Sequence, residues 1–345
     1  MALNAKLRNL VVVGASAGGQ QALSALIARL PASLPAAVLI VQHIAPYQPS
    51  MLAKVLSRST SMRVKQAQDE DQLDVGTIYV AVADRHLMVE HDRIRLARGP
   101  RECRARPSVN VLFRSAAVTF GRRAVGVVLS GALDDGTAGL WAIKDSGGMA
   151  LVQDPREALH SSMPENAISH VEVDLVGPVS ALCDKIVDSV GSVVTNGGAP
   201  DAKKGLRVEN EIATGESGLH AGVMELGEPS KYTCPECHGV LLRIQEGPIV
   251  RFRCHTGHAH SAKSLELGLI QSFEDSISDT LRALEERIML LVEMGATVKA
   301  TNRGDAEKWQ DLVERLQERL ALLREMLTDP SLPGSGGEER SAQSN

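Results

Sequence analysis

The chain has 345 residues and a formal net charge of −5, with 43% hydrophobic and 23% charged residues. This length accommodates two domains, or one large domain with an appendage, and the composition is ordinary for a globular protein. Aromatic residues make up only 3% of the chain, and the acidic excess lies in residues 261–345 without leaving a basic domain elsewhere. These features exclude nucleic-acid binding by base stacking or by charge.

Short β-branched runs alternate with helical patterns from residue 9 to about residue 193. The series starts with "LVVVG", an amphipathic helix and "AVLIVQ", and it ends with "AVGVVLS", "MALVQD" and a helix in "GPVSALCDKIVDSV". An insertion, "HLMVEHDRIRLA", predicts a hairpin that turns around residues 92–93. Such alternation is typical of βαβ units. The fold class predicted for residues 1–193 is therefore α/β, with a doubly wound, mostly parallel sheet in a Rossmann-like three-layer arrangement.

The composition and the periodicity of apolar residues change several times in the remaining sequence. Residues 194–230 are rich in Gly, Ala and polar residues without a sustained period, which predicts a linker, and residues 231–260 form a small Cys/His module. In residues 261–330, apolar side chains recur every three or four positions on either side of "KATNRGD". This pattern predicts an antiparallel helical hairpin. Residues 331–345 have the composition of a disordered tail.

The cysteines indicate a reducing compartment. There are five of them, an odd number, and three cluster within about twenty residues. This distribution favours metal binding over a disulfide framework. The N-terminus lacks the apolar core of a signal peptide, and no apolar run reaches membrane-spanning length. We expect a cytoplasmic protein that does not insert into membranes.

A serine stands at the tip of the first glycine-rich turn, "GASAGG" at residues 14–19. The turn follows a predicted strand and begins a helix, so its N–H groups and the helix dipole favour an anion. The spacing matches neither of the common nucleotide-binding motifs, and no lysine follows. Ser16 could therefore belong to a phosphate cradle, to a nucleophilic site or to a purely structural turn.

Two further strands end in residues that could activate a serine. His43 follows "LIVQ", and Asp134 and Asp135 follow the strand "AVGVVLS". In open α/β sheets, ligands bind at the carboxyl edge of the strands. A serine nucleophile needs a base, and the base needs an anion that orients it. The alternative interpretation is a structural histidine together with an aspartate that caps the following helix.

Six motifs, in order, resemble the catalytic domain of the CheB family of chemotaxis protein-glutamate methylesterases: "GASAGG", "VQHIAP", "DRHL", "RPSVNVLFRSAA", "VLSGALDDGTAGL" and "QDPREALHSSMPENAI". The resemblance implies a signal-transduction hydrolase that cleaves glutamate γ-methyl esters on cytoplasmic helices of chemoreceptors and often deamidates glutamines there. It implies that Ser16 is the nucleophile, His43 the general base and then acid, and Asp135 the orienting carboxylate. No cofactor is expected for catalysis.

The chain departs from the family pattern in three ways. CheB enzymes usually carry an N-terminal receiver domain, whereas here the catalytic strand begins near residue 10, so we expect no control by aspartyl phosphorylation in cis. Ala17 stands where relatives often have Thr, which removes a hydroxyl. Asp134 stands where Asn commonly precedes the catalytic aspartate, and we expect this additional acid to be solvated.

The matched motifs also contain groups that could bind the oxyanion or the substrate. Acyl transfer needs donors for an oxyanion, and the backbone N–H groups near Ala17 and Ala132 lie in turns at the predicted sheet edge. Arg114 and His86 are either surface or helix-capping groups, or contacts to substrate. The residues themselves do not decide between these interpretations.

The Cys/His module has the spacing of a metal site. Cys234 and Cys237 form a C-x₂-C knuckle, and Cys254 and His258 form a C-x₃-H pair. Three thiolates and one imidazole can close a tetrahedron, and so small a module lacks the core to fold without a staple. We therefore predict a structural Zn²⁺. Competitors for the fourth position are His238, His255 and His260.

The predicted partners follow from the resemblance and from the acidic hairpin. The substrate would be the methylated cytoplasmic helices of chemoreceptors, and residues 261–330 would form a homodimer or bind a signalling protein. An alternative function is a non-enzymatic scaffold that binds partners through the zinc module and the hairpin. A nucleotide-binding domain is disfavoured, because "HIAP" follows the second strand where a ribose-binding acid is needed.

Overall fold

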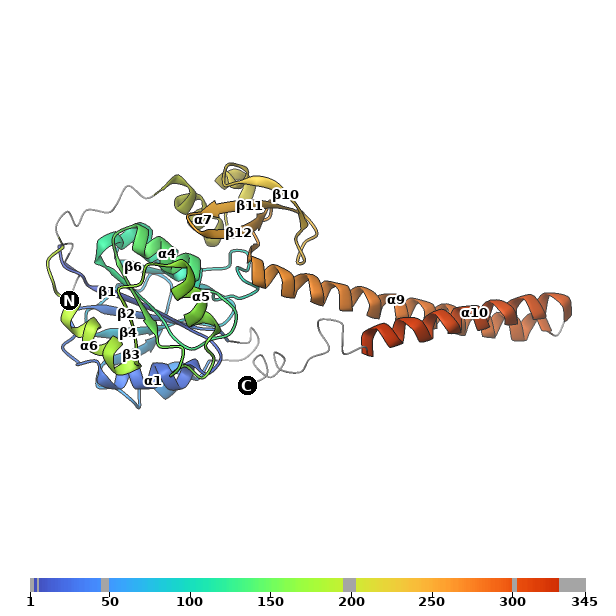
Figure 1. Ribbon diagram of the computed structural model, residues 1–345, viewed down its shortest axis with the longest axis horizontal. Coiled ribbons are helices and arrows are strands. Elements are labelled where there is room, and N and C mark those ends of the chain that lie inside the picture. Colours follow the sequence, from blue (N-terminus) through green and yellow to red (C-terminus); the bar gives the residue numbers. More distant parts are fainter. Residues whose placement is uncertain (1–2, 5, 45–49, 195–202, 300–302, 329–345) are drawn as a thin grey trace. The chain divides into compact units, whose positions relative to one another are not determined.

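The computed structural model describes residues 3–4, 6–44, 50–194, 203–299 and 303–328 (Figure 1). The chain divides into two compact units, Met1–Leu265 and Glu266–Asn345. Within the described ranges, no helix combines the length and the apolar composition needed to cross a bilayer.

A parallel sheet forms the centre of the first unit. In the described residues it has seven strands, ordered β3-β4-β2-β1-β7-β8-β9. Every neighbouring pair is parallel. The strands are β1 (Leu10–Ala15), β2 (Ala37–Gln42), β3 (Arg63–Gln66), β4 (Thr77–Val80), β7 (Ala124–Val128), β8 (Met149–Gln153) and β9 (Leu175–Gly177). The predicted doubly wound α/β fold is confirmed.

Helices cover both faces of this sheet, because the central strands are apolar on both sides. Val11 and Val13 of β1 pack in one cluster with α1 (Gly19–Arg29), α2 (Leu52–Leu56) and α6 (Val179–Ser189). Leu10 and Val12 pack in the other with α3 (Val109–Phe120), α4 (Thr137–Asp145) and α5 (Ser162–His170) (Figure 1). A short 3-10 turn, η1 (Gly121–Arg123), joins α3 to β7.

The predicted insertion is a two-stranded hairpin, β5 (His86–Glu90) and β6 (Arg93–Ala97). Glu90 pairs with Arg93, so the turn residues are His91 and Asp92, one position earlier than expected. His91 has a positive φ of 55°, which is the conformation that a tight hairpin turn demands.

The second half of this unit contains more regular structure than its sequence indicates. A four-stranded antiparallel sheet joins β10 (Glu228–Thr233), β11 (Val240–Glu246), β12 (Ile249–Cys254) and β13 (Ala259–Ser261). Before it come α7 (Lys204–Thr214), α8 (Gly218–Ala221) and η2 (Val223–Glu225), which lie within the 194–230 segment expected to be a linker. Residues 195–202 of that segment lie outside the described residues.

The sequence pattern did not predict helix α7, because the buried face of this helix carries a charged residue. Leu206, Val208 and Ile212 are buried, and Glu209 between them is also buried, at 1% exposure. A periodicity search counts such a glutamate as solvent-facing. The partners that permit its burial are far away in the sequence, on β12.

Two long helices form the described part of the second unit. They are α9 (Ala262–Lys299), whose first four residues belong to the first unit, and α10 (Arg303–Thr328). Arg324 of α10 forms an ion pair with Glu285 of α9. Ile277 and Leu291 of α9 are buried, as are Leu316 and Leu320 of α10. The predicted helix pair is confirmed, whereas the expected tail at 331–345 lies outside the described residues.

Candidate functional site

Ser16 directly follows β1 in a sharp turn. Gly18, with a φ of 69°, begins α1, and a left-handed residue is what allows the chain to reverse there. Gly131, after β7, faces the same turn: a Cβ on it would lie 2.9 Å from the Cβ of Ser16 and 2.0 Å from Met163 Sδ. Glycine is therefore required at residue 131 for the β7 loop to approach the serine.

His43 lies beside this serine because β1 and β2 are parallel neighbours. Its Nδ1 is 3.0 Å from Ser16 Oγ, and its Nε2 is 2.8 Å from Asp135 Oδ2. When Nε2 carries the ring proton and donates a hydrogen bond to the carboxylate, Nδ1 has a lone pair and accepts a hydrogen bond from the serine hydroxyl. This tautomer is the one that a general base needs.

Asp135 is 2% exposed and is surrounded by donors. Oδ2 accepts from His43 and from the Val109 N–H at 2.7 Å. Oδ1 accepts from the Ser108 hydroxyl at 2.9 Å, from the Asn110 N–H at 3.0 Å and from the Gly136 N–H at 2.9 Å. All five contacts use the two carboxylate oxygens as acceptors, so they fix the orientation of the group to which His43 Nε2 donates.

Three residues at the start of α3, its N-cap Ser108 and the first two helical residues, belong to the candidate site, and no motif in the sequence pointed to them. Ser108, Val109 and Asn110 hold Asp135, and the Asn110 side-chain oxygen accepts from the Gly139 N–H at 2.7 Å as well. The available signal was a serine just before a predicted helix, a typical N-cap position. Here the helix N-terminus is satisfied by a carboxylate from a distant loop, which no local pattern reveals.

Asp134 is less exposed to solvent than we expected. It is partly buried, and its Oδ1 accepts a hydrogen bond of 2.7 Å from the hydroxyl of Ser261. Burial raises the pKa of this carboxyl, an effect that the Ser261 hydrogen bond opposes. Ser261 is the last residue of β13, whose first two residues belong to the Cys/His module, so the end of the module lies beside the residue next to Asp135.

Arg114 and His86 are neither surface groups nor exposed to a substrate. Arg114 is 2% exposed and pairs with Glu102, while His86 is fully buried. His86 Nε2 donates to the Pro100 carbonyl, and Nδ1 accepts from the Ser108 N–H. Burial lowers the pKa of this imidazole, consistent with a neutral ring that supports the start of α3.

Two backbone N–H groups near Ser16, those of Ala17 and Ala132, donate to no backbone carbonyl within the described part of the chain. Both residues are partly exposed, in the turns after β1 and β7. They are the donors expected from the sequence to receive an oxyanion.

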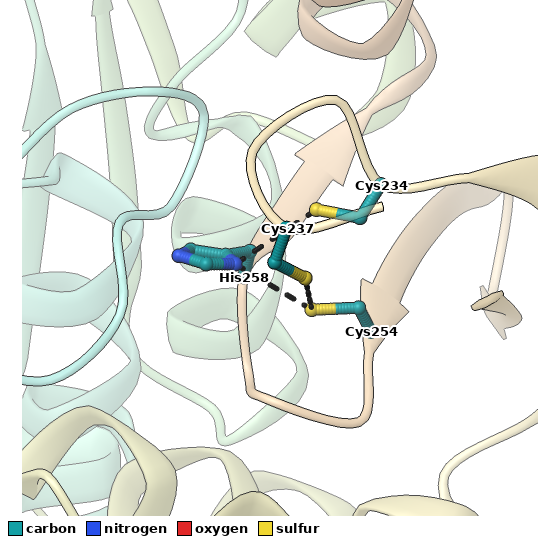
Figure 2. A group of neighbouring side chains, drawn as sticks. All are labelled: Cys234, Cys237, Cys254 and His258. Atoms are coloured by element: carbon teal, nitrogen blue, oxygen red, sulfur yellow. Dashed lines mark hydrogen bonds between the residues drawn. The ribbon is translucent and has the colours of Figure 1, made fainter. Parts of the chain in front are cut away.

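The Cys/His module contains a compact cluster of metal-ligating groups (Figure 2). One ligand atom each from Cys234, Cys237, Cys254 and His258 lies within 4.8 Å of the others. The Cys237–Cys254 Sγ separation is 3.6 Å, and His258 Nδ1 lies 3.6 Å from Cys254 Sγ and 3.8 Å from Cys234 Sγ. This group could hold a metal ion.

Three separations within this cluster, 3.6, 3.6 and 3.8 Å, match those of a tetrahedral zinc site. Ligands at the usual zinc distances, about 2.3 Å for sulfur and about 2.1 Å for nitrogen, stand roughly 3.5–3.8 Å apart in a tetrahedron. His260 is the nearest competitor, with Nε2 at 3.5 Å from Cys234 Sγ, but it lies outside the four-ligand group. The donor set therefore fits a tetrahedral thiolate-imidazole site.

The comparisons with known proteins concern the sheet-forming part of the chain. A protein-glutamate methylesterase/protein-glutamine glutaminase from Methanosarcina mazei is 39% identical over 192 residues, which are 53% of this chain and 52% of that protein. A relative of the same description from Leptospira interrogans is 36% identical over 167 residues, 48% of this chain and 86% of its own length. The chain spans about half the length of the Methanosarcina relatives it matches.

A solved structure has a similar fold in the same part of the chain. The crystal structure of the Thermotoga maritima CheB methylesterase catalytic domain aligns with a TM-score of 0.51 and 29% identity, over 53% of this chain and 98% of that domain. The model of the CheB methylesterase family matches residues 11–186, the span that carries Ser16, His43 and Asp135. This chain belongs to the CheB methylesterase family.

Proposed function

We propose that this protein hydrolyses the γ-methyl esters of glutamates on the cytoplasmic helices of chemoreceptors. The observation that carries the proposal is the chain of hydrogen bonds from Ser16 through His43 to Asp135, at the carboxyl edge of a CheB-type sheet. A serine with a base at 3.0 Å, oriented by a buried carboxylate, is the geometry of an activated nucleophile.

The proposed reaction has two steps. His43 Nδ1 takes the Ser16 hydroxyl proton as Oγ attacks the ester carbonyl, and it gives that proton to the methoxide oxygen as the carbonyl carbon–methoxide bond breaks and methanol leaves. Water, activated by His43, then cleaves the acyl-serine and releases glutamate. Asp135 keeps the imidazole in the required tautomer and stabilises its protonated form, and the N–H groups of Ala17 and Ala132 receive the oxyanion.

Methanol release tests this activity. Wild-type protein should release methanol from a methylated receptor fragment, and Ser16→Ala should release almost none. Equal release by both would refute the proposal. Because the relatives' names also include a glutaminase, ammonia release from a receptor fragment with glutamine at the methylation positions tests deamidation by the same serine.

We further propose that the Cys/His cluster binds Zn²⁺ for structure rather than for catalysis. When bound, the ion would supply the staple that a module of this size needs, because all four positions are filled by protein ligands. Elemental analysis should find one zinc per chain in the wild type and much less in Cys237→Ser. Equal zinc in both would refute this site.

The helix pair favours an additional binding role. Several of its large apolar side chains are exposed, among them Phe273, Met289, Leu290, Val292 and Leu322. We propose that it mediates a homodimer or binds a signalling protein in the cytoplasm. Light scattering of the full chain and of Leu290→Ser should differ in mass if a dimer forms there.

A further inference from the structure

The position of Asp135 depends on the residues that begin α3. Three of its five donors come from Ser108, Val109 and Asn110. A carboxylate held by donors on one segment follows that segment when it moves. Whatever fixes the start of α3 therefore sets the distance and angle between Asp135 and His43.

The segment that leads into α3, residues 99–107, is paired with the Cys/His module. The Ala259 N–H donates to the Arg101 carbonyl at 3.2 Å, and the Cys103 N–H donates to the Ala259 carbonyl at 2.8 Å. Ala259 directly follows His258 of the metal-ligating cluster. Strand β13 of the module is thus hydrogen-bonded to this segment in the way that two neighbouring strands of a sheet are.

A buried ion pair adds a second link between the two parts. Glu102 accepts from Arg114 of α3 at 2.7 Å and from Arg253 of β12 at 2.7 Å, and Arg253 directly precedes the ligand Cys254. All three side chains are at most 3% exposed. Burial alone would raise the pKa of Glu102, but Arg114 and Arg253 hold it down at about 2.

Arg253 is held by α7 and by the loop that joins Cys254 to His258. It donates to Glu209 of α7 at 2.7 Å and to the Gly257 carbonyl at 2.7 Å. Gly257 lies in the loop between Cys254 and His258, so the geometry of that loop places the guanidinium. A metal ion that fixes the loop would therefore fix the Arg253 side chain, and through it Glu102 and α3.

We propose that Glu102 and Arg253 are positioning residues for the hydrolytic site, through which the metal-loaded module holds Asp135 against His43. The inference rests on the proposed esterase activity. The hydrogen bond from Ser261, two residues after Ala259, to Asp134 is a further contact beside Asp135. The module is thus part of the catalytic device rather than a separate appendage.

Kinetics of the zinc-loaded full chain test this role. Glu102→Gln keeps the size of the side chain and removes its charge, and the exposed Glu228→Gln of β10 is the matched control. A misplacement of the catalytic groups by about 1 Å costs on the order of 100-fold in rate. We expect Glu102→Gln to lower kcat by about 10- to 100-fold with KM within twofold of the wild type, and Glu228→Gln to leave both unchanged.

Removal of Zn²⁺ by a chelator gives a second perturbation that needs no substitution. Its readout is hydrogen exchange in full-length Ser16→Ala, which requires no activity. We expect chelation to speed amide exchange in residues 101–112 by at least about tenfold, and added Zn²⁺ to restore the protection. Exchange in β1 and β2 should stay as slow as before, which distinguishes local release from unfolding.

Several results would overturn the inference. If chelation loosens residues 231–261 while exchange in residues 101–112 is unchanged, the module does not hold the start of α3. If Glu102→Gln raises KM and leaves kcat intact, Glu102 does not position the triad. If no variant or wild type releases methanol, the esterase proposal fails, and the exchange measurement still decides whether the module holds this segment.

Discussion

Asp135→Asn is the substitution whose effect the structure defines most closely. The carboxylate accepts five hydrogen bonds and donates none. An amide nitrogen at the Oδ2 position would face the Val109 N–H and would require His43 Nε2 to accept. The imidazole proton would then sit on Nδ1, facing Ser16, and the base could no longer take the hydroxyl proton.

The opposite orientation of the amide that Asp135→Asn introduces leaves more hydrogen-bond donors facing one another. An amide nitrogen at the Oδ1 position would oppose the N–H groups of Asn110 and Gly136, which lie at 3.0 and 2.9 Å. Two donors facing a third leave buried polar groups unsatisfied. The first orientation is therefore favoured, and it holds the base in the inactive tautomer. In serine triads this change lowers kcat by about 10⁴-fold, which is about 5.5 kcal/mol of activation free energy.

The assay is methanol release under saturating methylated receptor fragment. Asp184→Asn, with 71% side-chain exposure, serves as the matched control and should retain the wild-type kcat. Thermal unfolding should show that Asp135→Asn is still folded at the assay temperature. A folded Asp135→Asn variant that keeps more than about a tenth of wild-type kcat would refute the assignment of Asp135 as the orienting carboxylate.

Three further predictions concern packing and ionisation. Gly131→Ala should lower kcat by about 100-fold, because the added Cβ would collide with Met163 and displace Ser16; methanol release that stays within twofold of the wild type would contradict this. The pKa of Glu102 is depressed to about 2 from an ordinary 4.5, so its stabilisation is complete above pH 4.5 and is lost as pH falls toward 2. Urea unfolding from pH 6 to pH 3 should therefore show a smaller loss of stability in Glu102→Gln than in the wild type, and equal losses would count against the ion pair. Burial raises the pKa of the Cys183 thiol to about 11, so iodoacetamide at pH 8 should label it only in urea; rapid labelling of the native protein would show that the thiol is accessible.

The sequence carried enough information for the sheet and for the residues at its edge. Valine-rich runs of five or six residues, separated by amphipathic helices, can bury both faces only in a parallel α/β sheet. Strand ends then place Ser16, His43 and Asp135 at one edge, since all strands point the same way. The four residues of the Cys/His cluster could also be predicted from the sequence, because the spacing within each pair is short and local.

The buried charges could not be predicted in this way. Glu102, Glu209 and Arg253 read as solvent-facing residues, yet each is at most 2% exposed. Arg253 pairs with both glutamates, Glu102 also pairs with Arg114, and Glu209 also pairs with Arg251. These ion pairs join α7 and the Cys/His module to the sheet-forming part of the same compact unit. Asp134 was likewise expected to face solvent, and it is instead bonded to Ser261, 127 residues away.

The sequence by itself determined which side chains are available for chemistry and which strand end or loop carries each of them, because periodicity and ligand spacing are local properties of the chain. Only the tertiary structure decided that the beginning of α3 holds Asp135 and that the module pairs with the segment leading into it. Burial of a charge depends on a partner supplied by a distant segment, and that partner exists only after the chain has folded.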